Sequence, residues 1–122
     1  MEMVNSGAVH PKRRFLVTGG AGYVGSAVVA QLLDIGHEVT VLDDLSRGRP
    51  ELLFPGARFV RASIGDRDRL RALFGDTNFD CVMHFAAYAL VAESVANPSL
   101  YIGNNVHQTQ NLLDEMGAAG IR

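Results

Sequence analysis

Short apolar runs alternate with longer amphipathic stretches along the 122 residues. The apolar runs, partly β-branched, predict buried strands at 13–18, 38–42, 58–61 and 81–85. Apolar positions three and four residues apart predict helices over 22–35, 67–74 and 98–117. Loops are expected at 45–56, 75–78 and 86–97, with room for a helical turn near 50–54 and 91–95. Strands that alternate with helices predict an α/β fold built from parallel βαβ units.

Local signals mark the ends and the buried faces of these helices. Gly36 is expected to end the first helix in the left-handed conformation, and Asp66 to cap the second. Asn97 and Pro98 would begin the third, as cap and first-turn proline. The residues expected to face the core are Val24, Ala27, Val28, Leu32 and Ile35 in the first helix and Leu70, Leu73 and Phe74 in the second.

A glycine-rich turn joins the first strand to the first helix. Gly20, Gly22 and Gly25 fit G-x-G-x-x-G, and Gly19, Gly22 and Gly25 fit the looser G-x-x-G-x-x-G. Such glycines permit a sharp turn, a close approach of backbone N–H groups to a pyrophosphate, and tight helix–strand packing. Because the start of a helix attracts anions, the turn predicts a phosphate site, with a turn that binds nothing as the alternative.

An acid follows the second strand at the spacing of a dinucleotide fingerprint. Asp43 lies 18 residues after Gly25, where a carboxylate can accept hydrogen bonds from both hydroxyls of an adenosine ribose. It would repel a 2′-phosphate and so favours NAD over NADP, whereas the guanidinium of Arg47 could pair with that phosphate. Together, glycines and acid predict an incomplete Rossmann-like, doubly wound parallel sheet of about four strands in the order 3-2-1-4.

Other residues are expected to border the same crevice. Ile64 could pack on an adenine ring beside Ser63, although a plain loop is equally compatible with this pair. Asn104 and Asn105 are poor interior helix residues, which indicates a side-chain hydrogen bond across the crevice. The small apolar group expected to leave room for a cofactor after the fourth strand is Phe85, Ala86 and Ala87.

Two reactive residue types are interpreted as structural. His84 lies within an apolar strand and is expected to be a hydrogen-bonded core residue, not a catalytic one. Cys81 is expected to be buried in the same strand without a cation to activate it. Neither has the neighbours that a metal site requires, so we predict no metal site and no catalytic residue within this chain.

Composition excludes several functional classes. The net charge is −2, and acidic and basic residues are mixed along the chain. The chain therefore has neither the basic surface that binds nucleic acid nor a polybasic surface that binds membranes. No apolar run is long enough for a membrane span. The single cysteine allows no internal disulfide and favours a reducing, cytoplasmic setting. Residues 1–12 are expected to be a flexible leader and 13–122 the dinucleotide-binding domain.

Five blocks of the sequence carry a family resemblance. They are Thr18-Gly19-Gly20-Ala21-Gly22-Tyr23-Val24-Gly25-Ser26, Val41-Leu42-Asp43-Asp44-Leu45-Ser46, His84-Phe85-Ala86-Ala87-Tyr88, Val91-Ala92-Glu93-Ser94-Val95, and Pro98 through Asn104-Asn105-Val106 with Asn111-Leu112-Leu113. With these blocks the chain resembles, from about 14 to 122, the amino-terminal part of the UDP-glucose 4-epimerases, which belong to the extended short-chain dehydrogenase/reductase family of NAD-dependent epimerases and dehydratases.

The resemblance implies an NAD-dependent inversion at C4 of a UDP-hexose through a 4-keto intermediate, as in galactose metabolism, in a homo-oligomer such as a homodimer. It implies NAD contacts at Gly19, Gly22, Tyr23, Val24, Gly25, Asp43, Asp44, Leu45, Ser46, Arg47, Gly48, Ser63, Ile64, Phe85, Ala86, Ala87 and Asn104. Two positions depart from the family pattern, since Ser63 stands where members usually have Asp and Ala89 where many have Lys.

The family's catalytic Tyr-x-x-x-Lys is not in these residues. Tyr23, Tyr88 and Tyr101 are followed four positions later by Ala27, Ala92 and Asn105. The chain is therefore expected to be an amino-terminal, NAD-binding fragment that does not epimerise a sugar by itself. Two alternatives remain, namely another sugar-nucleotide epimerase or dehydratase, and a non-catalytic dinucleotide-binding module. The strand at 13–18 or that at 81–85 would lie at an open sheet edge and promote self-association.

Overall fold

A four-stranded parallel sheet forms the centre of the molecule. The computed structural model describes residues 11–46, 48–86, 99 and 103–121. The sheet has the order β3-β2-β1-β4 and confirms the predicted topology. Its strands are β1 (Arg14–Thr18), β2 (Glu38–Leu42), β3 (Arg58–Val60) and β4 (Cys81–His84). The sequence predicted that either β1 or β4 would lie at an open edge of the sheet. Within the described sheet β4 lies at an edge, whereas β1 has a neighbouring strand on each side.

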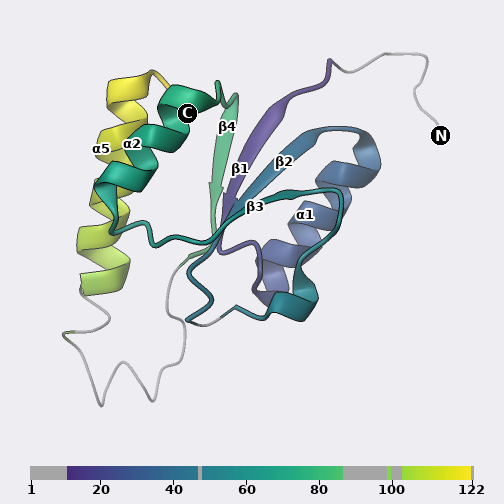
Figure 1. Ribbon diagram of the computed structural model, residues 1–122, viewed down its shortest axis with the longest axis horizontal. Helices are drawn as coiled ribbons and strands as arrows, with labels where there is room; N and C mark the ends of the chain where they lie inside the picture. The colour runs from purple at the N-terminus through teal and green to yellow at the C-terminus, as the bar shows by residue number, and fades with distance from the viewer. Residues whose placement is uncertain (1–10, 47, 87–98, 100–102, 122) are drawn as a thin grey trace.

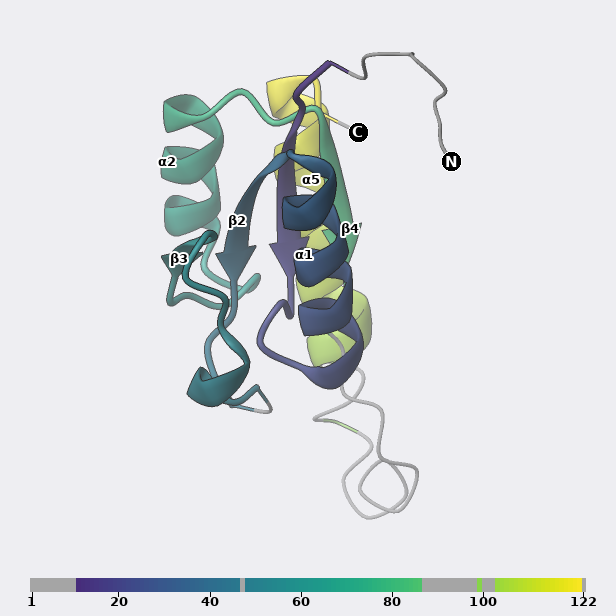
Figure 2. The same cartoon turned by 90° about the vertical axis from the view of Figure 1, so that its right-hand side faces the viewer.

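Helices cover both faces of this sheet. In Figure 1, α1 (Tyr23–Ile35) lies on one side of the strands, while α2 (Arg67–Asp76) and α5 (Thr109–Ala119) lie together on the other. Figure 2 shows α1 in front of the sheet and α5 behind it. A 3-10 turn, η1 (Pro50–Leu52), falls within the predicted loop, and a π-helical segment, η2 (Gly103–Gln108), leads into α5.

The two helical layers create two apolar cores, one on each face of the sheet. Neighbouring residues of β1 point to opposite faces, so Leu16 packs toward α2 and α5 whereas Val17 packs toward α1. Both side chains have no exposed surface. This two-sided burial explains why β1 reads as a continuous apolar run instead of an alternating one.

The buried face of α1 differs from the predicted stripe. Gly25, Ser26 and Val29 are its buried residues, while Val24 and Ile35 are 64% and 63% exposed. The expectation was wrong for Val24 and Ile35 and confirmed for Leu32, which packs against the core. Small residues such as Gly25 bring the start of the helix against the glycine turn. Ser26 can be buried there because its hydroxyl donates to the backbone oxygen of Tyr23 over 3.1 Å.

Most predicted helix ends agree with the structure. Gly36 ends α1 with φ 105°, and the Asp66 carboxylate accepts a hydrogen bond from the Arg69 N–H at the start of α2. The predicted face of α2 is buried at Leu70, Leu73 and Phe74. Several boundaries shift. The α2 helix includes residues 75 and 76, which were predicted to be a turn, and α5 ends at Ala119. The starts of β1 and α1 and the ends of β3 and β4 each differ by one residue from the prediction. The predicted start at Asn97 and Pro98 and the turn at 91–95 lie outside the described residues.

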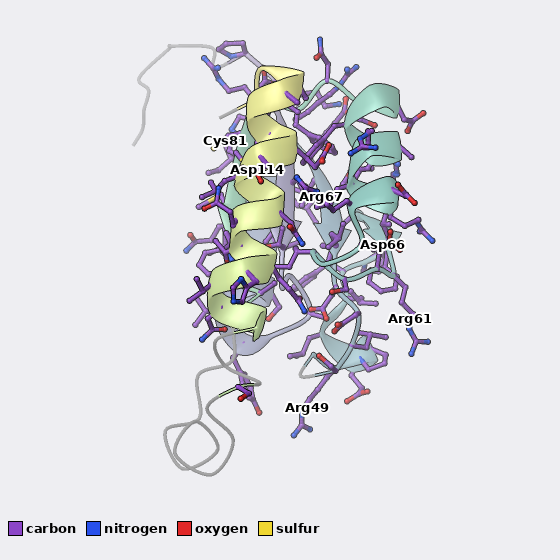
Figure 3. The ribbon with its side chains drawn as sticks, turned by 90° about the vertical axis from the view of Figure 1, so that its left-hand side faces the viewer. Arg49, Arg61, Asp66, Arg67, Cys81 and Asp114 are labelled. Carbon is purple, nitrogen blue, oxygen red and sulfur yellow. The ribbon has the colours of Figure 1, made fainter. Side chains whose placement is uncertain are left out.

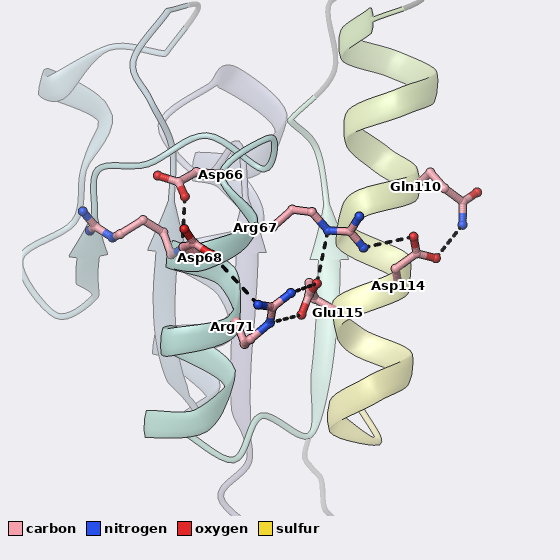
Figure 4. Close-up of polar contacts among 8 residues, drawn as sticks. Asp66, Arg67, Asp68, Arg71, Gln110, Asp114 and Glu115 are labelled. Carbon is pink, nitrogen blue, oxygen red and sulfur yellow. Dashed lines mark hydrogen bonds and ion pairs between the residues drawn. The ribbon is translucent and has the colours of Figure 1, made fainter.

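A network of ion pairs joins α2 to α5. Figure 3 shows Arg67 reaching from α2 toward α5, and Figure 4 shows Arg67 and Arg71 both meeting Glu115. The Glu115 residue is only 6% exposed, and its Oε2 accepts from Arg67 Nε at 3.2 Å and from Arg71 Nη2 at 3.1 Å. These arginines lower the pKa of the Glu115 carboxyl, the Arg71 hydrogen bond most of all. The pairing fixes α5, and with it η2, against the rest of the fold.

Within the described residues, none of the helices is long and apolar enough to cross a membrane.

Cys81 is half-buried and not buried as predicted, because β4 lies at the sheet edge and has a neighbouring strand on one side only.

Candidate functional site

A cavity of about 460 Å³ opens at the carboxyl ends of the parallel strands. This end of an open α/β sheet, beside the strand where the order reverses, is where ligands bind in such folds. The segments that follow all four strands contribute to its wall, together with the end of η2. The lining residues are Gly19, Gly22, Tyr23, Val24, Gly25, Leu42, Asp43, Asp44, Ser46, Gly48, Ala62, Ser63, Ile64, His84, Phe85, Ala86 and Gln108.

Three glycines shape the turn on the floor of the cavity, each under a different constraint. Gly19 has φ +74°, and a Cβ there would lie 2.6 Å from the backbone carbon of Phe85. A Cβ on Gly25 would collide with the backbone oxygen of Gly19. A Cβ on Gly22 would meet only that oxygen, at 3.4 Å, an ordinary contact. Gly19 and Gly25 are therefore required by the fold, while Gly22 leaves space that the protein itself does not fill.

The start of α1 directs hydrogen-bond donors into this space. Gly22 is its N-cap and supplies no capping side chain, and no acidic residue stands in the first turn. The first N–H groups of a helix have no partner within the helix, and they carry the positive end of its dipole. Tyr23, Val24 and Gly25 all line the cavity, so an anionic group placed there would meet this end of the helix.

Asp43, 7% exposed, is held rigidly at the end of β2. Its Oδ2 accepts from the Ala21 N–H at 3.1 Å and its Oδ1 from the Leu45 N–H at 2.7 Å. Leu45 adopts φ 66°, a conformation uncommon for a side chain of its size, to make this bond. Each carboxylate oxygen keeps a further lone pair, so the group can still accept hydrogen bonds from a ligand. Asp44 beside it is exposed and adds a second negative charge.

His84 lies between the sheet and α5 at the edge of the cavity. Its Nδ1 is 2.5 Å from the Thr18 hydroxyl of β1, and its Nε2 is 3.1 Å from the Thr109 hydroxyl of α5. Burial lowers the pKa of the imidazole because desolvation disfavours the charged form of the ring. The expectation of a hydrogen-bonded histidine is confirmed, but the residue also borders the cavity, which its position in an apolar strand did not indicate.

The cavity brings together most of the residues predicted for a cofactor site. Thirteen of them line it: Gly19, Gly22, Tyr23, Val24, Gly25, Asp43, Asp44, Ser46, Gly48, Ser63, Ile64, Phe85 and Ala86. Leu45 is not a lining residue and contributes its N–H to Asp43. Arg47 and Ala87 lie outside the described residues, and so does the side chain of Asn104, whose backbone belongs to η2.

Four lining residues were not predicted: Leu42, Ala62, His84 and Gln108. Of these, Gln108 had a signal in the sequence, because it follows Asn104 by four positions and such residues share a helix face. Its side chain meets the loop after β3, where the Ser63 hydroxyl donates to Gln108 Oε1 over 3.2 Å.

A second cavity, of about 620 Å³, lies at the opposite ends of the strands. Its charged lining residues already pair with each other, Lys12 and Arg14 with Glu38, and Arg58 with Asp76. Across the described ranges, no cluster of three or more histidine, cysteine or acidic residues could hold a metal ion. The glycine turn and the fixed carboxylate of Asp43 therefore make the first cavity the better candidate for a ligand site.

The glycine cradle, the helix N-terminus and Asp43 together fit a dinucleotide. A sequence model of the NAD dependent epimerase/dehydratase family matches residues 15–122. The chain belongs to this family. The match covers nearly the whole chain and confirms the family resemblance seen in the sequence.

Several individual relatives that the chain resembles are UDP-glucose 4-epimerases. The chain is 49% identical over 110 residues to a UDP-glucose 4-epimerase of Streptomyces lividans, which covers 89% of this chain and 33% of the relative. Among solved structures, a UDP-glucose 4-epimerase of Thermotoga maritima with UDP-glucose is 38% identical, with a TM-score of 0.86 over 88% of this chain and 35% of that one. A UDP-glucose 4-epimerase of Brucella ovis in complex with NAD is also 38% identical, with a TM-score of 0.85 over 88% of this chain and 33% of that one.

These relatives are longer than this chain, which spans about a third of the length of the curated proteins that it matches. What it matches is their amino-terminal, NAD-binding part.

Proposed function

We propose that this chain binds NAD in the cavity at the carboxyl ends of its strands. The observation that carries the proposal is the convergence of a glycine cradle with open space at Gly22 and a backbone-anchored carboxylate at Asp43. The solved relative from Brucella ovis, which is in complex with NAD, supports the same assignment. Residues 13–122 would form this NAD-binding domain, preceded by a leader over residues 1–12.

Each part of the cofactor has a position in this proposal. The pyrophosphate would lie over Gly22 at the start of α1, where N–H donors are available. The adenosine ribose would bind Asp43, and the adenine ring would pack on Ile64 beside Ser63. The remaining proposed contacts are Gly19, Tyr23, Val24 and Gly25 around the phosphates, Asp44, Leu45, Ser46, Arg47 and Gly48 beside the ribose, and Phe85, Ala86, Ala87 and Asn104 toward the nicotinamide.

For the whole protein we propose the activity of a UDP-glucose 4-epimerase, the interconversion of UDP-glucose and UDP-galactose. When bound, NAD would supply the hydride acceptor and donor for the exchange at C4 of the hexose. The residues of this chain hold and orient the cofactor. They include no Tyr-x-x-x-Lys to deprotonate the 4-hydroxyl, so we expect these 122 residues alone to bind NAD without epimerising the sugar.

Two further features belong to the proposal. We place the protein in the cytoplasm, because a single cysteine is compatible with a reducing compartment. We also expect a homo-oligomer, such as a homodimer, as the resemblance to the UDP-glucose 4-epimerases implies.

Calorimetric titration with NAD and with NADP tests the site directly. We expect NAD to bind at least roughly tenfold more tightly, because the buried Asp43 carboxylate repels a 2′-phosphate. An Asp43→Asn chain should lose this preference, whereas Asp76→Asn, at the opposite end of the sheet, should keep it. Failure of the unmodified chain to bind NAD would contradict the proposed function. Equal affinity for both nucleotides would contradict the role given to Asp43.

A further inference from the structure

Gln108 crosses from the helical layer to the loop that follows β3. It is the last residue of η2, immediately before α5, and its side chain is half-buried at the wall of the cavity. A Cβ on Gly65 would lie 3.1 Å from Gln108 Cδ, so the amide lies close against the backbone of that glycine. The glutamine is thus held at the end of the cavity that Ser63 and Ile64 also line.

A short hydrogen-bond chain favours one orientation of the amide. The Gly65 N–H donates to the Ser63 hydroxyl oxygen at 3.0 Å. That hydroxyl can then donate its own proton to Gln108 Oε1, 3.2 Å away. Oε1 keeps a second lone pair, and in the part of the chain that the structure describes no partner is recorded for the two Nε2 protons. The amide can therefore offer one acceptor and one donor side by side.

We propose that Gln108 recognises the adenine edge of the bound dinucleotide and so determines the base that the site accepts. This inference rests on the proposed NAD site. A side-chain amide pairs with adenine through two hydrogen bonds, accepting from the exocyclic amine and donating to a ring nitrogen. The ring nitrogens need a donor, and the carboxylates of Asp43 and Asp44 supply acceptors only.

The pairing also predicts discrimination between bases. In hypoxanthine a carbonyl oxygen replaces the exocyclic amine of adenine, so it would face Gln108 Oε1 as a second acceptor. Ser63 disfavours a flip of the amide, because the flip would place Nε2 where Oε1 now accepts and leave the Ser63 hydroxyl proton without that acceptor. An amide held in one orientation therefore favours adenine, whereas a freely rotating one would serve both bases.

The test compares NAD with nicotinamide hypoxanthine dinucleotide by calorimetric titration. The unmodified chain should bind NAD roughly tenfold more tightly than the hypoxanthine analogue. Gln108→Leu should weaken NAD binding by roughly tenfold and bring the two affinities within about twofold of each other. The matched control is Gln110→Leu, because Gln110, two residues further along, is exposed and donates to Asp114 instead. It should leave both affinities unchanged.

A second variant keeps the proposal testable if Gln108→Leu does not fold. Ser63→Ala removes the hydroxyl that orients the amide and should reduce the preference for NAD by roughly fivefold with a smaller loss of affinity. An unchanged ratio of the two affinities in either folded variant would overturn the role of Gln108 while leaving the NAD site intact. If the unmodified chain binds neither nucleotide, the proposed function fails as well.

Discussion

Gly22 and Gly25 stand three residues apart and meet different surroundings. A Cβ on Gly22 would enter open cavity space, but one on Gly25 would collide with the Gly19 backbone. We expect Gly22→Ala to lower the free energy of unfolding by no more than about 1 kcal/mol, yet to weaken NAD binding by roughly tenfold or more because the methyl group occupies the phosphate position. Gly25→Ala should cost about 1–3 kcal/mol of stability through overpacking.

Urea denaturation and NAD titration of both variants separate these two effects. A Gly22→Ala chain that binds NAD as well as the unmodified chain would contradict the placement of the pyrophosphate. Equal loss of stability in the two variants would contradict the assigned roles of the glycines.

His84 is expected to make stability depend on pH just below neutrality. Burial lowers its pKa in the folded chain below the ordinary value of 6.5, and its two ring nitrogens face the hydroxyls of Thr18 and Thr109. The unfolded chain therefore binds more protons in this range, so the free energy of unfolding should fall as pH drops through 6.5. His84→Asn should flatten this part of the profile, measured by urea denaturation from neutral to mildly acidic pH.

His107 provides the matched control for this measurement, since its side chain is exposed in η2. His107→Asn should leave the slope between neutral and mildly acidic pH as it is. A slope that persists in His84→Asn would show that another group is responsible.

At the scale of whole elements, Glu115 is the residue that holds α5 against α2. Its buried carboxylate meets Arg67 and Arg71, whereas Asp114 beside it is about half-exposed and pairs with Arg67 alone among these arginines (Figure 4). Glu115→Gln should lower the urea midpoint clearly more than Asp114→Asn, because it removes a buried carboxylate that accepts charge-assisted hydrogen bonds from two arginines, whereas Asp114 forms one half-exposed pair with Arg67.

The pKa of Glu115 is lowered by Arg71 and Arg67, so its contribution is present above the ordinary value of 4.5 and is lost as pH falls through the lowered value. A Glu115→Gln chain should accordingly lose less stability on acidification than the unmodified chain does. Equal midpoints for Glu115→Gln and Asp114→Asn would contradict the role given to the buried carboxylate.

The elements that the sequence predicts well are those encoded by neighbouring residues. The strands, the Gly36 stop and the Asp66 cap depend on local periodicity and backbone conformation, and all of them agree with the structure. The buried face of α1 could not be read this way, because it depends on how closely Gly25 lets the helix approach the glycine turn. The Arg67–Glu115 pair and the Ser63–Gln108 bond join residues more than forty positions apart, which local periodicity cannot indicate.

At the scale of the molecule, the candidate site is a product of the sheet order. Parallel strands in the order β3-β2-β1-β4 place the segments after every strand at the same edge. The glycine turn, Asp43, Ile64 and Phe85 therefore line one cavity although they are distant in the chain. Strand order and the dinucleotide fingerprint therefore predicted Asp43, Ile64 and the glycines of the lining, and the family resemblance added residues such as Tyr23 and Ser46. Gln108, which reaches the cavity from the helical layer, was missed.

The sheet order also leaves the outer edge of β4 available for a second copy of the chain. In the described sheet β4 pairs with β1 alone, and α1 packs on β1 and β2, so Met83 stays half-exposed beside that edge. We expect the 122-residue chain to self-associate through this edge. Light scattering over a concentration series should show a species larger than the monomer, and Met83→Lys should shift it to monomer because a charge beside the edge opposes strand pairing.

Gln110→Lys adds the same charge on the exposed side of α5 and should still associate, provided that circular dichroism shows both variants folded. A monomer at every concentration, or equal behaviour of the two lysine variants, would rule out pairing through β4.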